Sequence, residues 1–165
     1  MALTIHQKSA YLIFFNATMI SRSVGKSLHG NKTVKDFKIK VFEKVDRLTQ
    51  KIDTRTLTED DIIDSISDLS KEFRISFGQA QKPINVILKC HFYLTKSSHN
   101  NIKKILHCPV DSKNLERLGR SGISLTKIKR KMYLELQRDI QKRCSTRIEF
   151  DTQWDEQHLR DNGIL

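Results

Sequence analysis

Lys82 and Asp111 are the two residues of this 165-residue chain whose types and setting could support covalent chemistry, because they offer an amine and a carboxylate. Lys82 follows Gly78, which allows a turn, and precedes Pro83, which is tolerated in the first turn of a helix. We therefore expect a helix to begin near Gln81. There the helix dipole and any burial would both disfavour a cation and make the Lys82 amine a usable nucleophile. The alternative is a solvated lysine on an ordinary helix.

Asp111 follows the sequence Cys-Pro-Val and precedes a short helical pattern that begins at Ser112. Pro109 biases the residue before it away from helical geometry, so the chain is expected to turn at this point. An aspartate in that position can cap the helix, and it can also stabilise positive charge beside a reacting amine. The sequence leaves both roles open for Asp111.

Helices are expected to position this pair, because the apolar residues repeat mostly at helical spacing. Thr33, with an aspartate three residues later, and Thr58, followed by three acids, are typical helix starts. No convincing pair of alternating strands appears, which predicts a compact all-α fold with a turn before a central helix. The expected helices cover residues 6–20, 33–52, 58–73 and 81–94, a short segment after Asp111 and a basic segment from Ser124 or Thr126 to Ile140, with turns over 21–31 and a loop or short helix over 95–104.

The formal net charge of +11 is concentrated in one section of the chain. Residues 1–70 carry 11 Lys and Arg against 9 Asp and Glu, residues 71–147 carry 18 against 5, and residues 148–165 carry 1 against 5. A polyanion docking over the basic section 71–147, with nucleic acid the first choice, is the simplest interpretation, and a solubilising surface is the alternative. Residues 148–165 form an acidic tail.

The length and the cysteines indicate one cytoplasmic domain over residues 1–165. The three cysteines are odd in number and lack a Cys-x-x-Cys pair, which is typical of reduced thiols. The apolar run over residues 11–15 is too short to span a bilayer and has no secretory cleavage site. We expect a monomer with no membrane partner and no cofactor, since nucleotide-binding motifs are missing and the spacing of residues that could bind a metal, Cys90, His91, His99, His107 and Cys108, matches no zinc motif.

The stretch Gly78-Gln-Ala-Gln-Lys82, with Pro109-Val110-Asp111 downstream, resembles the lysine and aspartate motifs of helix-hairpin-helix DNA glycosylases. The 29-residue separation between the lysine and the aspartate, and the tail residues 150–154, look more like the archaeal type of 8-oxoguanine DNA glycosylase. The chain departs from the family at Ala80, where the hairpin has a second glycine. It departs again in the spacing of Asp151 and Trp154, which are three residues apart instead of four.

The resemblance implies a repair enzyme that acts on a damaged base flipped out of double-stranded DNA. Lys82 would attack the sugar and form a Schiff base that permits strand cleavage, and Asp111 would assist. Asp151 and Trp154 would bind the base, while the DNA backbone would be contacted by Gly78, Gln79, Gln81 and Lys89.

Other interpretations remain open on the residues alone. The chain could be a non-catalytic basic module that binds nucleic acid or a protein, and an RNA-cleaving helical domain is a third class without a motif of its own. Trp154 could close a core, and Asp151 could cap the last helix.

Overall fold

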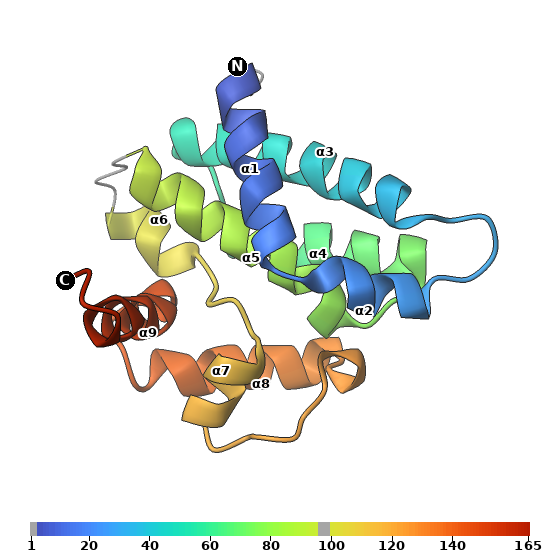
Figure 1. The fold of residues 1–165 in the computed structure, drawn as a ribbon. Coiled ribbons are helices and arrows are strands. Elements are labelled where there is room, and N and C mark those ends of the chain that lie inside the picture. Colours follow the sequence, from blue (N-terminus) through green and yellow to red (C-terminus); the bar gives the residue numbers. More distant parts are fainter. Residues whose placement is uncertain (1–2, 96–99) are drawn as a thin grey trace.

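The computed structural model describes residues 3–95 and 100–165, and within these ranges the chain is helical and contains no strand (Figure 1). This confirms the all-α prediction. In chain order the elements are α1 (Ile5–Ala17), α2 (Ile20–Ser27), α3 (Val34–Asp53), α4 (Glu59–Phe73), α5 (Phe77–Leu94), α6 (Asn100–Ile105), α7 (Ser112–Arg117), the 3-10 helix η1 (Leu125–Lys127), α8 (Arg130–Gln141) and α9 (Arg147–Asp161).

Threonine caps set the starts of α3 and α4. Thr33 accepts a hydrogen bond from the backbone N–H of Asp36, whose carboxylate in turn accepts one from the Thr33 N–H. Thr58 and Asp61 form the same reciprocal pair at α4. Each cap satisfies N–H groups that a helix start otherwise leaves without a partner, which is worth about 1 kcal/mol. Both predicted starts are confirmed.

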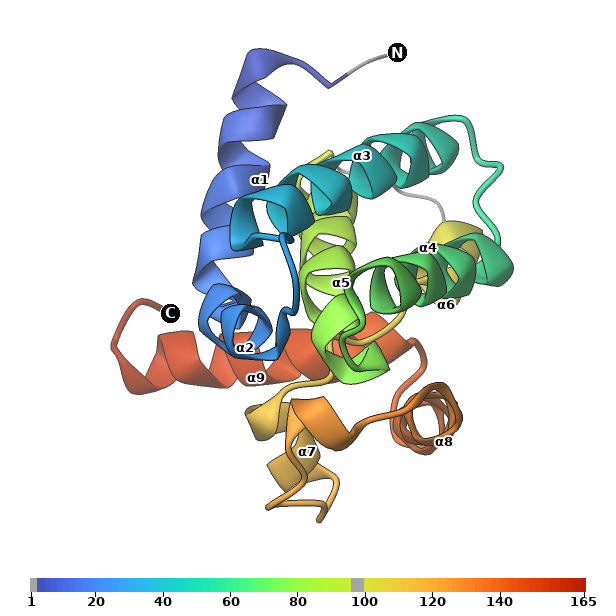
Figure 2. The same ribbon diagram turned by 90° about the vertical axis from the view of Figure 1, so that its right-hand side faces the viewer.

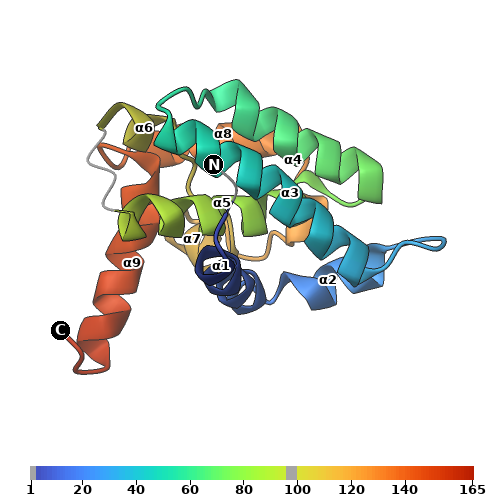
Figure 3. The same ribbon diagram turned by 90° about the horizontal axis from the view of Figure 1, so that it is seen from above.

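Helix α5 is the centre of the fold and contacts α1, α2, α3, α4, η1 and α8. Figures 2 and 3 show α3 and α4 side by side against it, with α1 on its other side. In Figure 1, α7, α8 and α9 lie below it. Most of its side chains are buried, including Ile84, Ile87 and Leu88, so the prediction of a central helix is confirmed.

The start of α5 differs from the prediction in a way that matters for Lys82. Ser76 caps the helix by accepting from the Gln79 N–H, so α5 begins at Phe77 rather than near Gln81. Lys82 is the sixth residue of the helix. Because the dipole acts within the first turn, it does not reach the Lys82 amine as the sequence suggested.

Gly78 lies inside the first turn of α5. It lets η1 and Ile128 approach this helix closely, and the chain does not reverse direction there. Its N–H donates to the carbonyl of Ile128 at 3.0 Å. A Cβ at this position would lie 2.4 Å from the Leu125 carbonyl oxygen and 2.8 Å from the Ile128 Cβ. Glycine is therefore required for η1 and the residue after it to pack on α5.

Three other boundaries were predicted wrongly. Residues 20–27 form α2, although serines and glycines there suggested a turn. The basic helix begins at Arg130, after the separate turn η1, because the chain around Ile128 is extended. The last helix begins at Arg147 with Thr146 as its cap, so Asp151 lies inside it and does not cap it.

Candidate functional site

Two glutamine side chains hold the extended segment before Asp111 against the centre of the fold. Gln81 of α5 accepts from the Val110 N–H at 3.1 Å and donates to the Val110 carbonyl at 2.6 Å. Gln137 of α8 accepts from the Cys108 N–H at 3.0 Å and donates to the Cys108 carbonyl at 2.7 Å. All four residues are buried, so these paired bonds fix the segment between α5 and α8.

This arrangement brings the neighbourhoods of Lys82 and Asp111 together. Lys82 directly follows Gln81, and Asp111 directly follows Val110, the two residues joined by the paired hydrogen bonds. Both Lys82 and Asp111 are half-buried. Among the described residues the Lys82 amine makes no ion pair, whereas Lys89, two turns further along α5, makes two.

Asp111 caps α7, as the sequence allowed. Its carboxylate accepts from the backbone N–H of Asn114 at 2.9 Å, and its backbone is extended. A cap uses one carboxylate oxygen for a hydrogen bond and keeps the other available. The capping role is therefore compatible with a second role toward the Lys82 amine.

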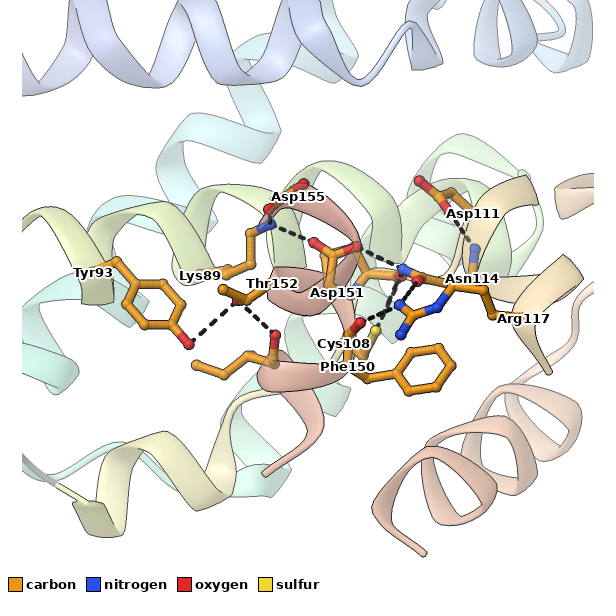
Figure 4. Close-up of polar contacts among 12 residues, drawn as sticks. Lys89, Tyr93, Cys108, Asp111, Asn114, Arg117, Phe150, Asp151, Thr152 and Asp155 are labelled. Carbon is orange, nitrogen blue, oxygen red and sulfur yellow. Dashed lines mark hydrogen bonds and ion pairs between the residues drawn. The ribbon is translucent and has the colours of Figure 1, made fainter. Parts of the chain in front are cut away.

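Asp151 and Lys89 form a buried ion pair that joins α9 to α5 (Figure 4). Asp155, one turn further along α9, also contacts the Lys89 amine, at 2.8 Å. Burial lowers the pKa of Lys89, but the charges and hydrogen bonds of the two aspartates outweigh it and raise that pKa above its ordinary value. Lys89 is therefore a cation whose charge is neutralised inside the protein.

Asn114 connects this ion pair to Asp111, and no role was predicted for it from the sequence. Its side-chain amide donates to Asp151 at 2.6 Å and to the Pro109 carbonyl at 2.8 Å, while its backbone N–H donates to Asp111 (Figure 4). The signal in the sequence was an asparagine three residues after a potential capping aspartate. The structure therefore brings Lys89, Asp111 and Asp151 into one polar network.

Trp154 lies on α9 outside the buried core. Its ring stacks on His158 of the same helix, with the ring centres 5.1 Å apart and the planes 8° apart. It is half-buried, so it does not close a core as one interpretation had it. Trp154 lies one residue before Asp155, and the contact between Asp155 and Lys89 keeps this part of α9 near α5.

The residues expected to contact the DNA backbone are used inside the chain instead. The Gly78 N–H is bonded to Ile128, and the buried Gln79 side chain donates to α2. Gln81 holds Val110, and Lys89 is paired with Asp151 and Asp155. Any phosphate contact therefore has to come from other residues.

Two buried histidines each link a tyrosine to a carboxylate. His107 is bonded to Tyr133 at 2.6 Å and to Glu59 at 2.7 Å, and Glu59 also pairs with Arg147. His91 bridges Tyr11 and Asp53 in the same way. Both rings have polar partners within the protein, and His99 lies outside the described residues. No group of three or more potential metal ligands occurs among the residues that the structure describes.

We expect stability to fall as the pH drops below about 6.5, the ordinary pKa of histidine. Burial lowers the pKa of His107, so the unfolded chain binds a proton there that the folded chain does not, and stability is lost as the pH falls. Hydrogen bonds from His107 and Arg147 lower the pKa of Glu59 to about 2, which adds a further loss below about 4.5.

Urea unfolding at pH 7.5, 6.5 and 5.5 measures this dependence. The variant His107→Gln should be less stable throughout and should show a shallower pH slope. An equal slope in both proteins would contradict the assignment to His107.

In the described ranges, no helix combines the length and apolar character that crossing a bilayer requires.

No protein-family model, curated protein or solved structure matches the chain, so its own geometry carries the functional proposal.

Proposed function

We propose that the chain is a DNA glycosylase with lyase activity, in which Lys82 is the nucleophile and Asp111 assists it. The observation that carries the proposal is the pair of hydrogen bonds between the Gln81 side chain and the Val110 backbone. These bonds join the residue before Lys82 to the residue before Asp111, and the half-buried Lys82 has no ion-pair partner among the described residues. The same two residues carry the resemblance to the helix-hairpin-helix glycosylases.

The polar network around Asp111 supports the proposal, because catalytic groups need fixed positions. The backbone before Asp111 is bonded by the side chains of Gln81, Gln137 and Asn114, and the Asp111 carboxylate itself accepts from the Asn114 backbone N–H. All three of these amide side chains are buried. The carboxylate is therefore held by α5, α7 and α8 together, and not by a loop alone.

The proposed reaction uses the neutral Lys82 amine. It attacks C1′ of the damaged nucleotide, and the base leaves with the electrons of the glycosidic bond. Asp111 stabilises the positive charge that develops on the sugar, and it accepts a proton from the attacking amine. The amine lone pair then forms the Schiff base as the C1′–O4′ bond breaks, and O4′ takes the proton that Asp111 accepted. The departed base takes the C2′ proton, and the electrons of that C–H bond expel the 3′ phosphate and nick the strand.

Base recognition is proposed for Trp154, which can stack on a purine after release from His158. We propose a smaller contribution of Asp151 to base binding, because both of its carboxylate oxygens already accept hydrogen bonds, from Lys89 and Asn114. A base edge would have to compete with these bonds. We favour 8-oxoguanine as the first lesion to test, on the resemblance of residues 150–154.

The proposal is tested with duplexes that contain 8-oxoguanine or an abasic site, incubated with the protein in the presence of borohydride. Reduction of a Schiff base would give a stable protein–DNA adduct on a denaturing gel. Undamaged duplex is the control and should give none. Failure to obtain an adduct with an abasic duplex that the protein binds would remove the lyase from consideration.

Asp111→Asn separates the two roles of this residue. Asparagine caps helices about as well as aspartate, so stability should change by less than about 0.5 kcal/mol. Loss of the charge should slow base release by roughly 10²- to 10⁴-fold. Single-turnover kinetics on an 8-oxoguanine duplex measure the rate, with urea unfolding as the control. An unchanged rate would leave Asp111 as a cap only.

A non-catalytic module that binds nucleic acid through its basic section is the second candidate. It is favoured by the position of Lys82 beyond the first turn of α5, where the helix dipole gives the amine no activation. This candidate predicts tight, salt-sensitive binding to DNA or RNA and no borohydride-trapped adduct with any lesion.

A further inference from the structure

A hollow lies where the end of α4, the start of α5 and the start of α8 meet. It is lined by three serines, three cations and two apolar residues, namely Ser67, Ser70, Lys71, Ile75, Ser76, Phe77, Lys129 and Arg130. Its lining contains positive charge and no carboxylate, and of its three hydroxyls those of Ser70 and Ser76 already donate to the carbonyls of Ile75 and Leu125. Surfaces with this composition suit an anion.

The positive charge extends beyond the hollow along the chain. Lys127, Lys129, Arg130 and Lys131 are four exposed cations within five residues. Within the described residues none of the four forms an ion pair, and neither does the exposed Lys71. On α3, by contrast, three lysines pair with acids, as in the bridges Lys40–Glu43, Lys44–Asp68 and Lys51–Asp61. The charge of the hollow is therefore not neutralised by the protein.

Two groups at the hollow have no side-chain hydrogen-bond partner among the described residues. The Ser67 hydroxyl is buried and has no hydrogen-bond partner among the described residues. Lys129 is the N-cap of α8 and supplies no side-chain acceptor to the backbone N–H groups that follow. A bound anion would satisfy such groups.

We propose that this hollow binds a phosphate of the DNA backbone, and that Lys127 and Lys131 contact neighbouring phosphates. The proposal rests on the proposed function in taking DNA as the ligand. A row of cations fits a polymer of phosphates better than a single phosphate group. Because the Gly78 N–H is bonded to Ile128, the segment that covers the start of α5 takes over the phosphate contact with its own side chains.

The hollow and Lys82 both involve the first half of α5. Ser76 lines the hollow and caps α5, and Lys82 follows six residues later. Six residues correspond to about 9 Å along a helix axis. Six residues also rotate the helix by about 240°, so the hollow and Lys82 lie on different faces of α5.

The double variant Lys129→Gln/Arg130→Gln tests the assignment on undamaged duplex DNA, by fluorescence anisotropy over a series of salt concentrations. We expect binding at least about tenfold weaker, and a plot of log affinity against log salt whose slope is smaller by about 2, since each lost phosphate contact removes about 0.9. The matched control Lys8→Gln/Arg47→Gln removes one exposed lysine and one exposed arginine from α1 and α3. It should leave both values nearly unchanged.

The outcomes separate this assignment from the proposed reaction. Equal losses of DNA affinity in both double variants would show an effect of net charge alone and overturn the site. Unchanged affinity in Lys129→Gln/Arg130→Gln would also overturn it. So would a wild-type protein that does not bind duplex DNA. The borohydride adduct is scored independently with abasic DNA. If the double variant loses affinity as expected but no adduct forms, the proposed reaction is rejected and the phosphate site is kept.

Discussion

We expect replacement of Asp151 by alanine to lower the free energy of unfolding by about 3–5 kcal/mol, the typical effect of removing one partner of a buried ion pair. Lys89 is 9% exposed and would keep its charge in the interior without its buried partner. The Asn114 amide would lose one acceptor at the same time and keep the Pro109 carbonyl. Urea unfolding of wild type and variant measures the difference.

Asp155→Ala is the matched control, because it removes the other carboxylate on Lys89. The Asp155 side chain is 45% exposed, against 11% for Asp151, so its loss should lower the free energy of unfolding by no more than about 1 kcal/mol. The pair Lys89→Met/Asp151→Leu should recover most of the stability, because it leaves no buried charge. A loss of unfolding free energy below about 1 kcal/mol in Asp151→Ala would contradict a structural role for Asp151 and favour its role as a base ligand.

Local signals in the sequence were sufficient for much of the fold. The threonine caps at Thr33 and Thr58 and the apolar stripes after them predicted α3 and α4 correctly, because caps and periodicity act within a few residues. The start of α5 was predicted wrongly for the same reason. The Pro83 signal outweighed the capping box of Ser76 and Gln79, although proline is accepted further inside this helix.

The site depended on contacts between distant parts of the chain, which periodicity does not report. Lys89 and Asp151 are 62 residues apart, and their opposite charges were assigned to two separate DNA contacts. The structure pairs them instead. Gln81 was also expected to contact DNA, but its side chain is bonded to Val110, 29 residues away in the chain. A buried polar group needs a partner, but the sequence does not say which one.

The second large effect concerns the nucleophile. We expect Lys82→Met to abolish the borohydride-trapped adduct with an abasic duplex and to leave DNA affinity within about threefold, because one half-buried lysine contributes little to phosphate binding. Methionine has a similar length and no amine, so the fold should be retained. Lys113→Met removes an exposed lysine of α7 two residues from Asp111 and should leave the adduct intact. Loss of the adduct in both variants would point to a general effect of charge.

Mass mapping of the reduced adduct tests the central claim most directly. After reduction with borohydride, nuclease digestion and proteolysis, the peptide that carries the sugar remnant identifies the lysine that formed the Schiff base. The proposed reaction predicts a single modified position, Lys82. A remnant on Lys113 or any other lysine, or no adduct from a duplex that the protein binds, would contradict it.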